Sequence, residues 1–264
     1  MLRSLKNMED YKVSASDGDI GSVSGFYFDD RHWTIRYLVV ETGGFWDGPA
    51  RVLISPIAFR EAEWATNRFH LALTRDKVKN SPGLPMDSPL SRQYEQNYFQ
   101  YYNWPYYWGY AGIWGDWGTP GGMSGKTWTQ PFDDRVDDNP HLRRSHDIIG
   151  CVVKGKDKDI GHVQDFIVDD ATWTIRYVVV NTRHWWSGKS VIVSPHWISK
   201  IDADDETIRV DLSADVVNNC PEWSPDQPVN REYEARLFDY YGRPTYWDGD
   251  KSKLQPQRAK TSTP

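Results

Sequence analysis

The chain has 264 residues, enough for one large domain or two small ones at roughly 100–200 residues per domain. Its 31 Lys and Arg against 37 Asp and Glu give a formal net charge of −6, which argues against a nucleic-acid partner because such a binder needs a net basic surface. No apolar run approaches the roughly 20 residues that span a bilayer, residues 1–10 lack the apolar core of a secretory signal, and two cysteines are too few for a disulfide framework. We therefore expect a cytoplasmic protein without a transmembrane segment. Its unusual feature is an aromatic content of 14%, including 14 Trp.

An internal repeat organises the chain. Residues 19–40 (DIGSVSGFYFDDRHWTIRYLVV) align with residues 159–180 (DIGHVQDFIVDDATWTIRYVVV) at an offset of 140, with 14 of 22 positions identical. One residue is lost in the following loop, so the later matches have an offset of 139. The whole repeat covers residues 11–108, called the first copy below, and residues 149–247, called the second copy. The sequence thus predicts a tandem duplication of one domain of about 100 residues.

Each copy is expected to be mainly β, with two short helices after the strands. Apolar and β-branched residues recur with a period near two, which predicts first-copy strands over residues 12–15, 20–28, 34–40, 52–55 and 69–73. Five or six short antiparallel strands of this kind favour a small closed barrel. Two helices follow, the second starting at Ser91 in the first copy and at Asn230 in the second, where Gly242 is expected to end it.

The segment between the copies differs in composition from both. Residues 109–140 are rich in Gly and Pro, which predicts a mobile linker, but Trp114, Trp117 and Trp128 favour partial packing on a neighbouring domain. The polar end of the chain predicts a disordered tail. The expected organisation is a first domain with its helices over 1–108, a linker over 109–140, a second domain with its helices over 141–247, and the tail over 248–264.

The repeated pattern resembles the PRC-barrel domain. The match is carried by D-I-G-x-V-x-x-F-x-x-D-D, I-R-Y-x-V-V and V-x-I-S-P, including Ile20-Gly21, Asp29-Asp30 and Pro56, and their second-copy counterparts. The family is known from the cytosolic part of the H polypeptide of the photosynthetic reaction centre, a ribosome maturation factor and many bacterial stand-alone proteins. The resemblance implies two tandem PRC-type β-barrels and an adaptor or assembly role, but no reaction. The chain shows neither the membrane helix of the reaction-centre polypeptide nor the extra N-terminal domain of the maturation factor.

The histidines and shared acids predict no metal or cofactor site. None of the seven His aligns with His in the other copy, and His141 with His146 lacks ligand spacing. The duplicated Asp29-Asp30 and Asp169-Asp170 could form a general acid–base pair, but their position favours turn chemistry. Cys151 and Cys220 are unmatched and are expected to be inert buried thiols. We find no nucleophile elbow, phosphate loop or Cys-x-x-Cys, so the sequence predicts no catalytic residues and no enzyme.

Two duplicated arginines have both a structural and a binding interpretation. Arg36 and Arg176 lie mid-strand, and an ion pair with a shared acid such as Glu95 or Glu234 would explain them. Arg92 and Arg231 could equally pair with those acids. The alternative is that these arginines bind an anionic partner segment.

The strongest functional signal is aromatic residues on loops. Residues 42–48 and 182–188 align, with Trp46 matching Trp186, and tryptophans in polar hairpin loops are typical of interface anchors. The alternative is that these rings plug the barrel end. The predicted interaction residues are Trp46, Trp186, Trp185, Phe45, Trp114 and Trp117.

These observations predict a non-enzymatic, cytoplasmic adaptor or assembly protein with a protein partner of unknown identity. One alternative is an accessory of a membrane photosynthetic or electron-transfer assembly. Another is a small-ligand or catalytic site in a cleft between the copies, lined by linker tryptophans and by His141 or His146.

Overall fold

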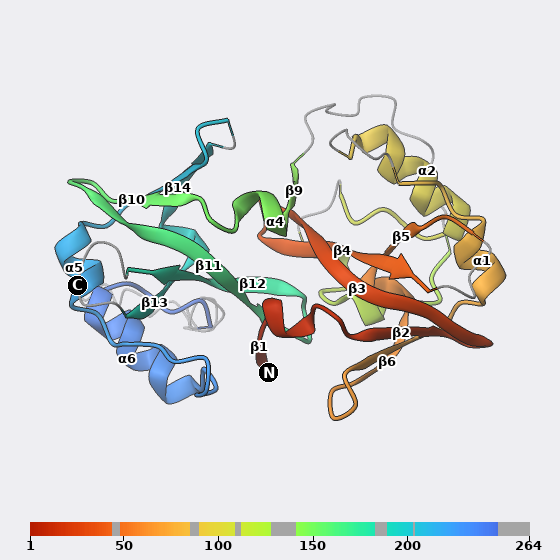
Figure 1. Cartoon of the computed structure of the whole chain (residues 1–264), viewed down its shortest axis with the longest axis horizontal. Coiled ribbons are helices and arrows are strands. Elements are labelled where there is room, and N and C mark those ends of the chain that lie inside the picture. Colours follow the sequence, from red (N-terminus) through yellow and green to blue (C-terminus); the bar gives the residue numbers. More distant parts are fainter. Residues whose placement is uncertain are drawn as a thin grey trace, which may run out of the picture.

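The structure is a computed structural model that describes residues 1–43, 48–84, 90–108, 112–127, 141–182, 189–202 and 204–247. It is mainly β, as predicted, with one large mixed sheet and a few short helices. Figure 1 shows the two copies side by side along the long axis, with their helices at opposite ends and the strands between them.

The first copy is a six-stranded sheet. Its strands are β2 (Lys12–Ala15), β3 (Gly18–Asp29), β4 (Thr34–Thr42), β5 (Arg51–Ile54), β6 (Phe59–Glu63) and β7 (Arg68–Leu71). They pair in the order β5-β4-β3-β2-β7-β6, and only the β2–β7 pair among them is parallel. The 3-10 helix η2 (Pro56–Ala58) joins β5 to β6. Strand β6 was not predicted, because its segment lacks a clear alternation of apolar and polar residues.

The second copy repeats this topology. Its strands are β10 (Val152–Lys154), β11 (Asp159–Asp169), β12 (Thr174–Asn181), β13 (Ser190–Val193), β14 (Ile198–Asp202) and β15 (Thr207–Val210), with η3 (Pro195–Trp197) between β13 and β14. The order β13-β12-β11-β10-β15-β14 matches that of the first copy. In the described residues, no backbone ladder joins β5 to β6 or β13 to β14. The expected barrel closure is therefore not made by direct pairing of these end strands.

Two helices follow the strands in each copy. They are α1 (Arg75–Lys79) and α2 (Arg92–Tyr102) in the first copy, and α5 (Ala214–Asn218) and α6 (Arg231–Tyr241) in the second. Ser91 and Asn230 cap the longer helices through their side chains, as predicted. Each of these helices ends at a residue in the left-handed region, Asn103 and Gly242, and the predicted stop at Gly242 is confirmed.

The linker is partly folded. Residues 112–127 form β8 (Ile113–Asp116) and α3 (Pro120–Met123), and Trp114 is buried while Trp117 packs against the core. The predicted contact of linker tryptophans with neighbouring parts of the chain is confirmed for these two. Trp128, the rest of the linker and the tail over 248–264 lie outside the described residues.

Each copy extends one short arm to the other copy. Strand β1 (Leu2–Ser4), followed by η1 (Lys6–Met8), pairs with β11 of the second copy. Strand β9 (Leu142–Arg144), followed by α4 (Ser145–Ile148), pairs with β3 of the first copy. The two pairings are equivalent at the 140-residue offset, since Leu2 lies opposite Asp169 and Leu142 lies opposite Asp29. Ion pairs of Arg3 with Asp170 (2.7 Å) and of Arg143 with Asp30 (2.8 Å) repeat this symmetry.

A reciprocal turn contact explains two of the duplicated tryptophans. Trp33 and Trp173 both adopt positive φ, at 50° and 58°, which costs a bulky residue about 1–2 kcal/mol. The Ile35 amide donates to the Trp173 carbonyl at 2.8 Å, and the Ile175 amide donates to the Trp33 carbonyl at 2.6 Å. The Trp173 ring lies 5.3 Å from Phe59 of the first copy, so the cost of its turn is offset by packing between the copies.

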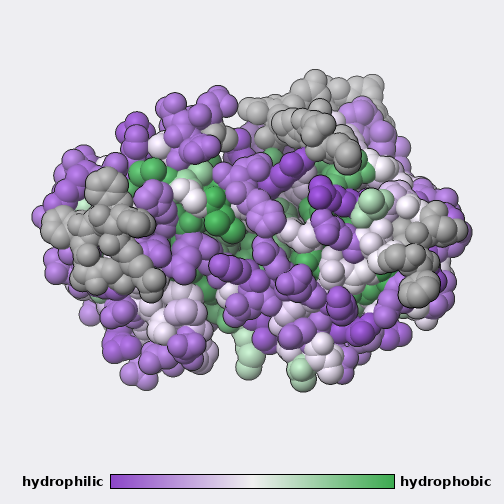
Figure 2. Space-filling model, viewed as in Figure 1, coloured by the Kyte–Doolittle hydropathy of each residue, from purple (hydrophilic) through white to green (hydrophobic). Residues whose placement is uncertain are grey.

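Burial accounts for most of the aromatic content. Among the described residues, the exposed large hydrophobic side chains are Met1, Val216 and Tyr240. Figure 2 agrees, because the face it shows is largely hydrophilic with apolar residues in separate patches. No helix in the described part of the chain has the length and apolar character to cross a membrane.

The contact between the copies makes Trp173 a stability determinant. We expect Trp173→Ala to lower the free energy of unfolding by about 3–5 kcal/mol, because it removes a buried ring from a packed aromatic cluster. Urea denaturation measures the change. Val216→Ala, at an exposed site on α5, is the control and should stay within about 0.5 kcal/mol of the wild type. A loss for Trp173→Ala no larger than that of the control would contradict this role.

Candidate functional site

The structure tests only part of the predicted interaction set. Trp46, Phe45, Trp185 and Trp186 lie outside the described residues, so their role stays a prediction. Trp114 is fully buried, and its Nε1 donates to the Thr172 carbonyl of the second copy at 2.6 Å. Trp114 therefore contacts its own chain and is not accessible to a partner, while Trp117 is half-buried.

Arg36 is held by an acid other than the one suggested from sequence. Arg36 Nη2 donates to Asp29 Oδ2 at 3.0 Å, and both side chains are buried. Burial alone would raise the pKa of Asp29, but the His32 hydrogen bond and the Arg36 charge hold it well below its ordinary value. Asp29 also accepts from the amides of Arg31 and His32, which confirms its predicted turn role. The suggestion of a Glu95 partner for Arg36 was wrong.

Glu95 belongs to a second buried network. Its Oε1 accepts from the Tyr37 hydroxyl at 2.9 Å and from the Tyr107 hydroxyl at 2.7 Å, and its Oε2 pairs with Arg92 at 2.6 Å. Burial raises the pKa of Glu95 despite these partners. Glu234, Tyr177, Tyr246 and Arg231 repeat the arrangement in the second copy. The alternative that Arg92 and Arg231 pair with these acids is confirmed, and the network ties each long helix to its sheet.

The histidines are dispersed. His32, His70, His141 and His146 each contact one acid, at 3.0, 3.2, 3.3 and 3.1 Å. Within the residues that the structure describes, no three His, Cys, Asp or Glu side chains come together to hold a metal ion. Both cysteines are free and buried, as expected, and burial raises the pKa of each thiol.

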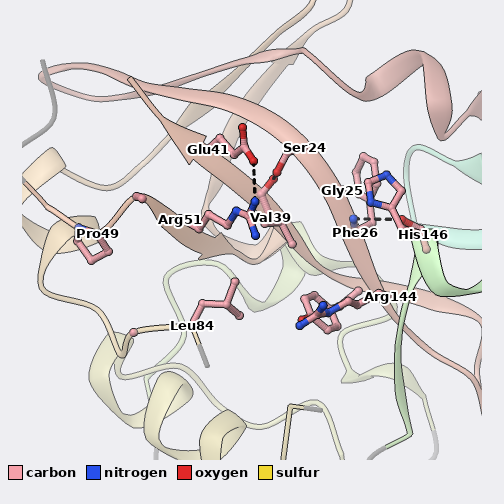
Figure 3. A pocket seen from close by; sticks show the side chains of 14 residues that line it. Ser24, Gly25, Phe26, Val39, Glu41, Pro49, Arg51, Leu84, Arg144 and His146 are labelled. Atoms are coloured by element: carbon pink, nitrogen blue, oxygen red, sulfur yellow. Dashed lines mark hydrogen bonds and ion pairs between the residues drawn. The ribbon is translucent and has the colours of Figure 1, made fainter. Parts of the chain in front are cut away.

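A cavity of about 630 Å³ opens beside the first copy. Strands β3 and β4 form its floor, the start of β5 and the segment after α1 form one wall, and β9 with α4 form the other. Figure 3 shows Arg51 and Glu41 on one side, Arg144 and His146 on the other, and Leu84 between them. A volume of this size is typical of sites that bind small molecules or bulky side chains.

Polar groups surround an apolar interior. Arg51 pairs with Glu41 at 3.1 Å, Arg144 Nε donates to the Tyr27 hydroxyl at 2.6 Å, and the Phe26 amide donates to Ser145 Oγ at 3.3 Å. Val39, Pro49 and Leu84 contribute apolar surface to the lining. Two arginines, Arg51 and Arg144, against one lining glutamate, Glu41, give the rim a basic balance. The cavity is thus suited to an apolar or aromatic group that carries an acidic neighbour.

The corresponding space in the second copy is partly filled, and an opening of about 290 Å³ lined by Ser4, Ile167 and Trp223 remains there. Trp223 replaces Leu84, is nearly buried, and its amide donates to the Ser190 carbonyl at 3.0 Å. Asp165 replaces Gly25 and accepts from the Lys6 amide at 3.0 Å and from Ser4 Oγ, which binds the arm to β11. In the first copy, a Cβ added at Gly25 would lie 3.4 Å from the His146 ring, so glycine leaves room there.

Of the cavity's lining residues, only His146 was proposed from the sequence as part of a site, as one candidate for a cleft between the copies. The signal lay in aligned positions where the first copy has the smaller residue: Leu84 for Trp223, Gly25 for Asp165, and Ser24 for Gln164. The contribution of Arg144 and His146 could not be found in this way, because it depends on the exchange of arms between the copies.

The buried Asp29–Arg36 pair predicts a pH-dependent loss of stability. The pKa of Asp29 is lowered in the folded protein, so its contribution is complete above its ordinary value of 3.8 and declines as the pH falls below it. We expect Asp29→Asn to cost about 3–5 kcal/mol at neutral pH, since it leaves Arg36 buried without its counter-charge. Urea denaturation at about pH 7 and about pH 3 should show the gap to wild type narrowing in acid.

Asp169→Asn is the matched control for this pair. Asp169 and Arg176 are less buried, at 21% and 17% exposed, so we expect a smaller loss. Equal losses in the two variants, or a gap that does not change with pH, would contradict the assignment.

The contrast between the two copies predicts reciprocal effects on the cavity. Leu84→Trp should reduce it without loss of stability, whereas Trp223→Leu should cost about 2–4 kcal/mol and enlarge the opening in the second copy. Titration with anilinonaphthalene sulfonate, an anionic apolar dye, should show fewer sites per chain in Leu84→Trp and more in Trp223→Leu. An unchanged number of dye sites in both variants would refute the comparison.

A comparison with known protein families finds a match in the second copy. Residues 140–217 match the family described as the PRC-barrel domain, from the second arm through the strands and into α5. No curated protein matches the chain. This match supports the PRC-barrel resemblance for residues 140–217.

Proposed function

We propose that this chain is a non-enzymatic adaptor or assembly protein built from two PRC-type domains, and that it binds a protein partner through the first-copy cavity. A PRC-barrel domain generally suggests a module for protein interaction or assembly, and residues 140–217 match one. The first copy has the same strand order and shares the repeat, which supports its assignment to the same type. A cytoplasmic location remains part of this proposal.

The observation that carries the proposal is the contrast between Leu84 and Trp223. Where the second copy reduces the space to about 290 Å³ with its own indole, the first copy leaves about 630 Å³ open to solvent. A partner that inserts a bulky apolar or aromatic side chain there would restore the packing seen in the other copy. Arg51 and Arg144 at the rim favour an acidic residue beside that side chain.

The predicted loop tryptophans fit the same proposal. The residues just after the loop that contains Phe45 and Trp46, from Pro49 to Arg51, line the cavity. A partner seated in the cavity would therefore contact residues that directly follow this loop in the sequence. The narrower role as an accessory of a membrane photosynthetic or electron-transfer assembly rests on the family resemblance alone.

Site-specific photocrosslinking tests the proposal. A benzophenone amino acid at Ala50, on the cavity wall, should give a discrete adduct with a partner in cells, and Leu84→Trp in the same chain should abolish it. Lys189 aligns with Ala50 in the second copy and is the matched control position, where we expect no such adduct. An adduct that survives Leu84→Trp, or one that forms equally from Lys189, would sink the proposal.

A second candidate function is the binding of a small anionic apolar ligand, and the cavity volume favours it. Part of this matches the expected cleft, because His146 lines the cavity, but His141, Trp114 and Trp117 do not. Native mass spectrometry of the purified chain separates the two functions. A bound small molecule that is lost in Leu84→Trp supports the ligand, and a protein adduct without one supports the adaptor.

A further inference from the structure

A second pair of equivalent sites shows the opposite asymmetry, with the first copy filled. The Arg36 guanidinium lies between two rings, 3.7 Å from the Tyr107 centroid and 4.7 Å from the Trp114 centroid. Its Nη1 donates to the carbonyl of Ile113, and only 1% of its side chain is exposed. The linker strand β8 thus covers Arg36 with one ring and one carbonyl oxygen.

Arg176 has the same surroundings without that cover. It pairs with Asp169 at 3.1 Å, close to the 3.0 Å of the Arg36 pair, and it stacks on Tyr246 at 4.3 Å. No second ring and no carbonyl acceptor for its Nη1 are present among the described residues, and 17% of its side chain is exposed. Within the described residues, the guanidinium therefore has a ring stacked on one face and none on the other.

The cover over Arg36 shows what the open face would accept. An added Cβ at Gly112 would meet the Gly115 carbonyl oxygen at 2.1 Å, and Gly115 has φ +61°, so the chain turns tightly through Gly-Ile-Trp-Gly. This turn presents the Ile113 carbonyl and the Trp114 ring together. The ring also donates to the Thr172 carbonyl in the turn of the opposite copy.

The repeat also contains a counterpart of the Thr172 acceptor. His32 is the counterpart of Thr172, and its carbonyl accepts only from Thr34 Oγ1, at 3.0 Å, among the described residues. A carbonyl oxygen has two lone pairs, so a second donor can bind there. The reciprocal hydrogen bonds of Trp33 and Trp173 place this turn against the second copy in the same way that the Thr172 turn lies against the first.

The C-terminal sequence that aligns with the covering turn differs from it in composition. At the 139-residue offset, Ser252 and Lys253 align with Ile113 and Trp114. Residues 248–264 contain no aromatic residue, and a lysine over Arg176 would repel it. The repeat therefore encodes no second copy of the covering turn, and a partner polypeptide that presents such a turn has the required chemistry.

We propose that Arg176, Tyr246 and the His32 carbonyl form a binding site for a partner polypeptide that presents a tryptophan at a glycine-rich turn. The partner's indole stacks on the open face of Arg176, its Nε1 donates to the His32 carbonyl, and the preceding carbonyl accepts from Arg176 Nη1. The partner's tryptophan thus makes with Arg176 and His32 the contacts that Trp114 makes with Arg36 and Thr172. This site is separate from the cavity, and its test does not depend on the cavity.

The test uses the chain's own turn as the probe. A fluorescently labelled peptide of residues 112–118, Gly-Ile-Trp-Gly-Asp-Trp-Gly, is titrated with the full chain and followed by anisotropy. We expect saturable binding of one peptide per chain, weakened about tenfold or more by Arg176→Gln and by replacing the first peptide Trp with Ala. Arg209→Gln removes an exposed arginine elsewhere on the second copy and should leave binding unchanged.

Two further variants keep the result decisive. If Arg176→Gln does not fold, Arg176→Lys retains the charge next to Asp169 but loses the planar group, and it should still weaken binding severalfold. Leu84→Trp should have no effect, and a loss of peptide binding there would assign the peptide to the cavity and overturn the proposal. Absence of binding at millimolar peptide, or equal affinity for wild type and the Arg176 variants, would also overturn it.

Discussion

The structure depends on the reciprocal exchange of two short arms. Strand β1 completes the sheet of the second copy, β9 completes that of the first, and each is fixed by an arginine–aspartate pair. The turns at Trp33 and Trp173 add hydrogen bonds in both directions. Because every one of these contacts has a counterpart, the two copies are held in a single relative orientation. An arm of three residues could not order itself alone, so its pairing energy must come from the opposite copy.

This symmetric frame allows the sites on it to diverge. The Asp–Arg pair, the buried glutamate and its tyrosines are retained in both copies, because removing one member of a buried charged network is costly. Positions at the edge of the frame are less constrained. There, Trp223 occupies space that Leu84 leaves open, and the Ile113–Trp114 turn covers an arginine whose counterpart, Arg176, has a ring on one face only among the described residues. Each filled site therefore indicates the chemistry that its open counterpart can accept.

Much of the fold could be predicted from local residue patterns, and little of the sites could. The alternation in residues 34–40, the cap at Ser91 and the stop at Gly242 act through neighbouring residues, so their signals are present in the sequence. The surroundings of Arg36 were harder to predict. Its acid, Asp29, is seven residues away, and Glu95 was an equally plausible partner. Its stacking rings come from the segment after α2 and from the linker. The cavity needed even more distant information, because Arg144 and His146 reach it only through the exchanged arm. The repeat itself held the missing signal, in aligned pairs of unequal size.

A fixed orientation of the copies also bears on how a partner would be held. The cavity lies on the first copy and the Arg176 face on the second, and the arms keep their separation constant. A partner whose two segments match that separation would bind the second site intramolecularly, with an affinity far above that of either site alone. A partner with segments too close or too far apart would gain nothing. Loss of the β1 arm, which lines neither site, would therefore weaken such a partner, because it would remove the fixed spacing on which the gain depends.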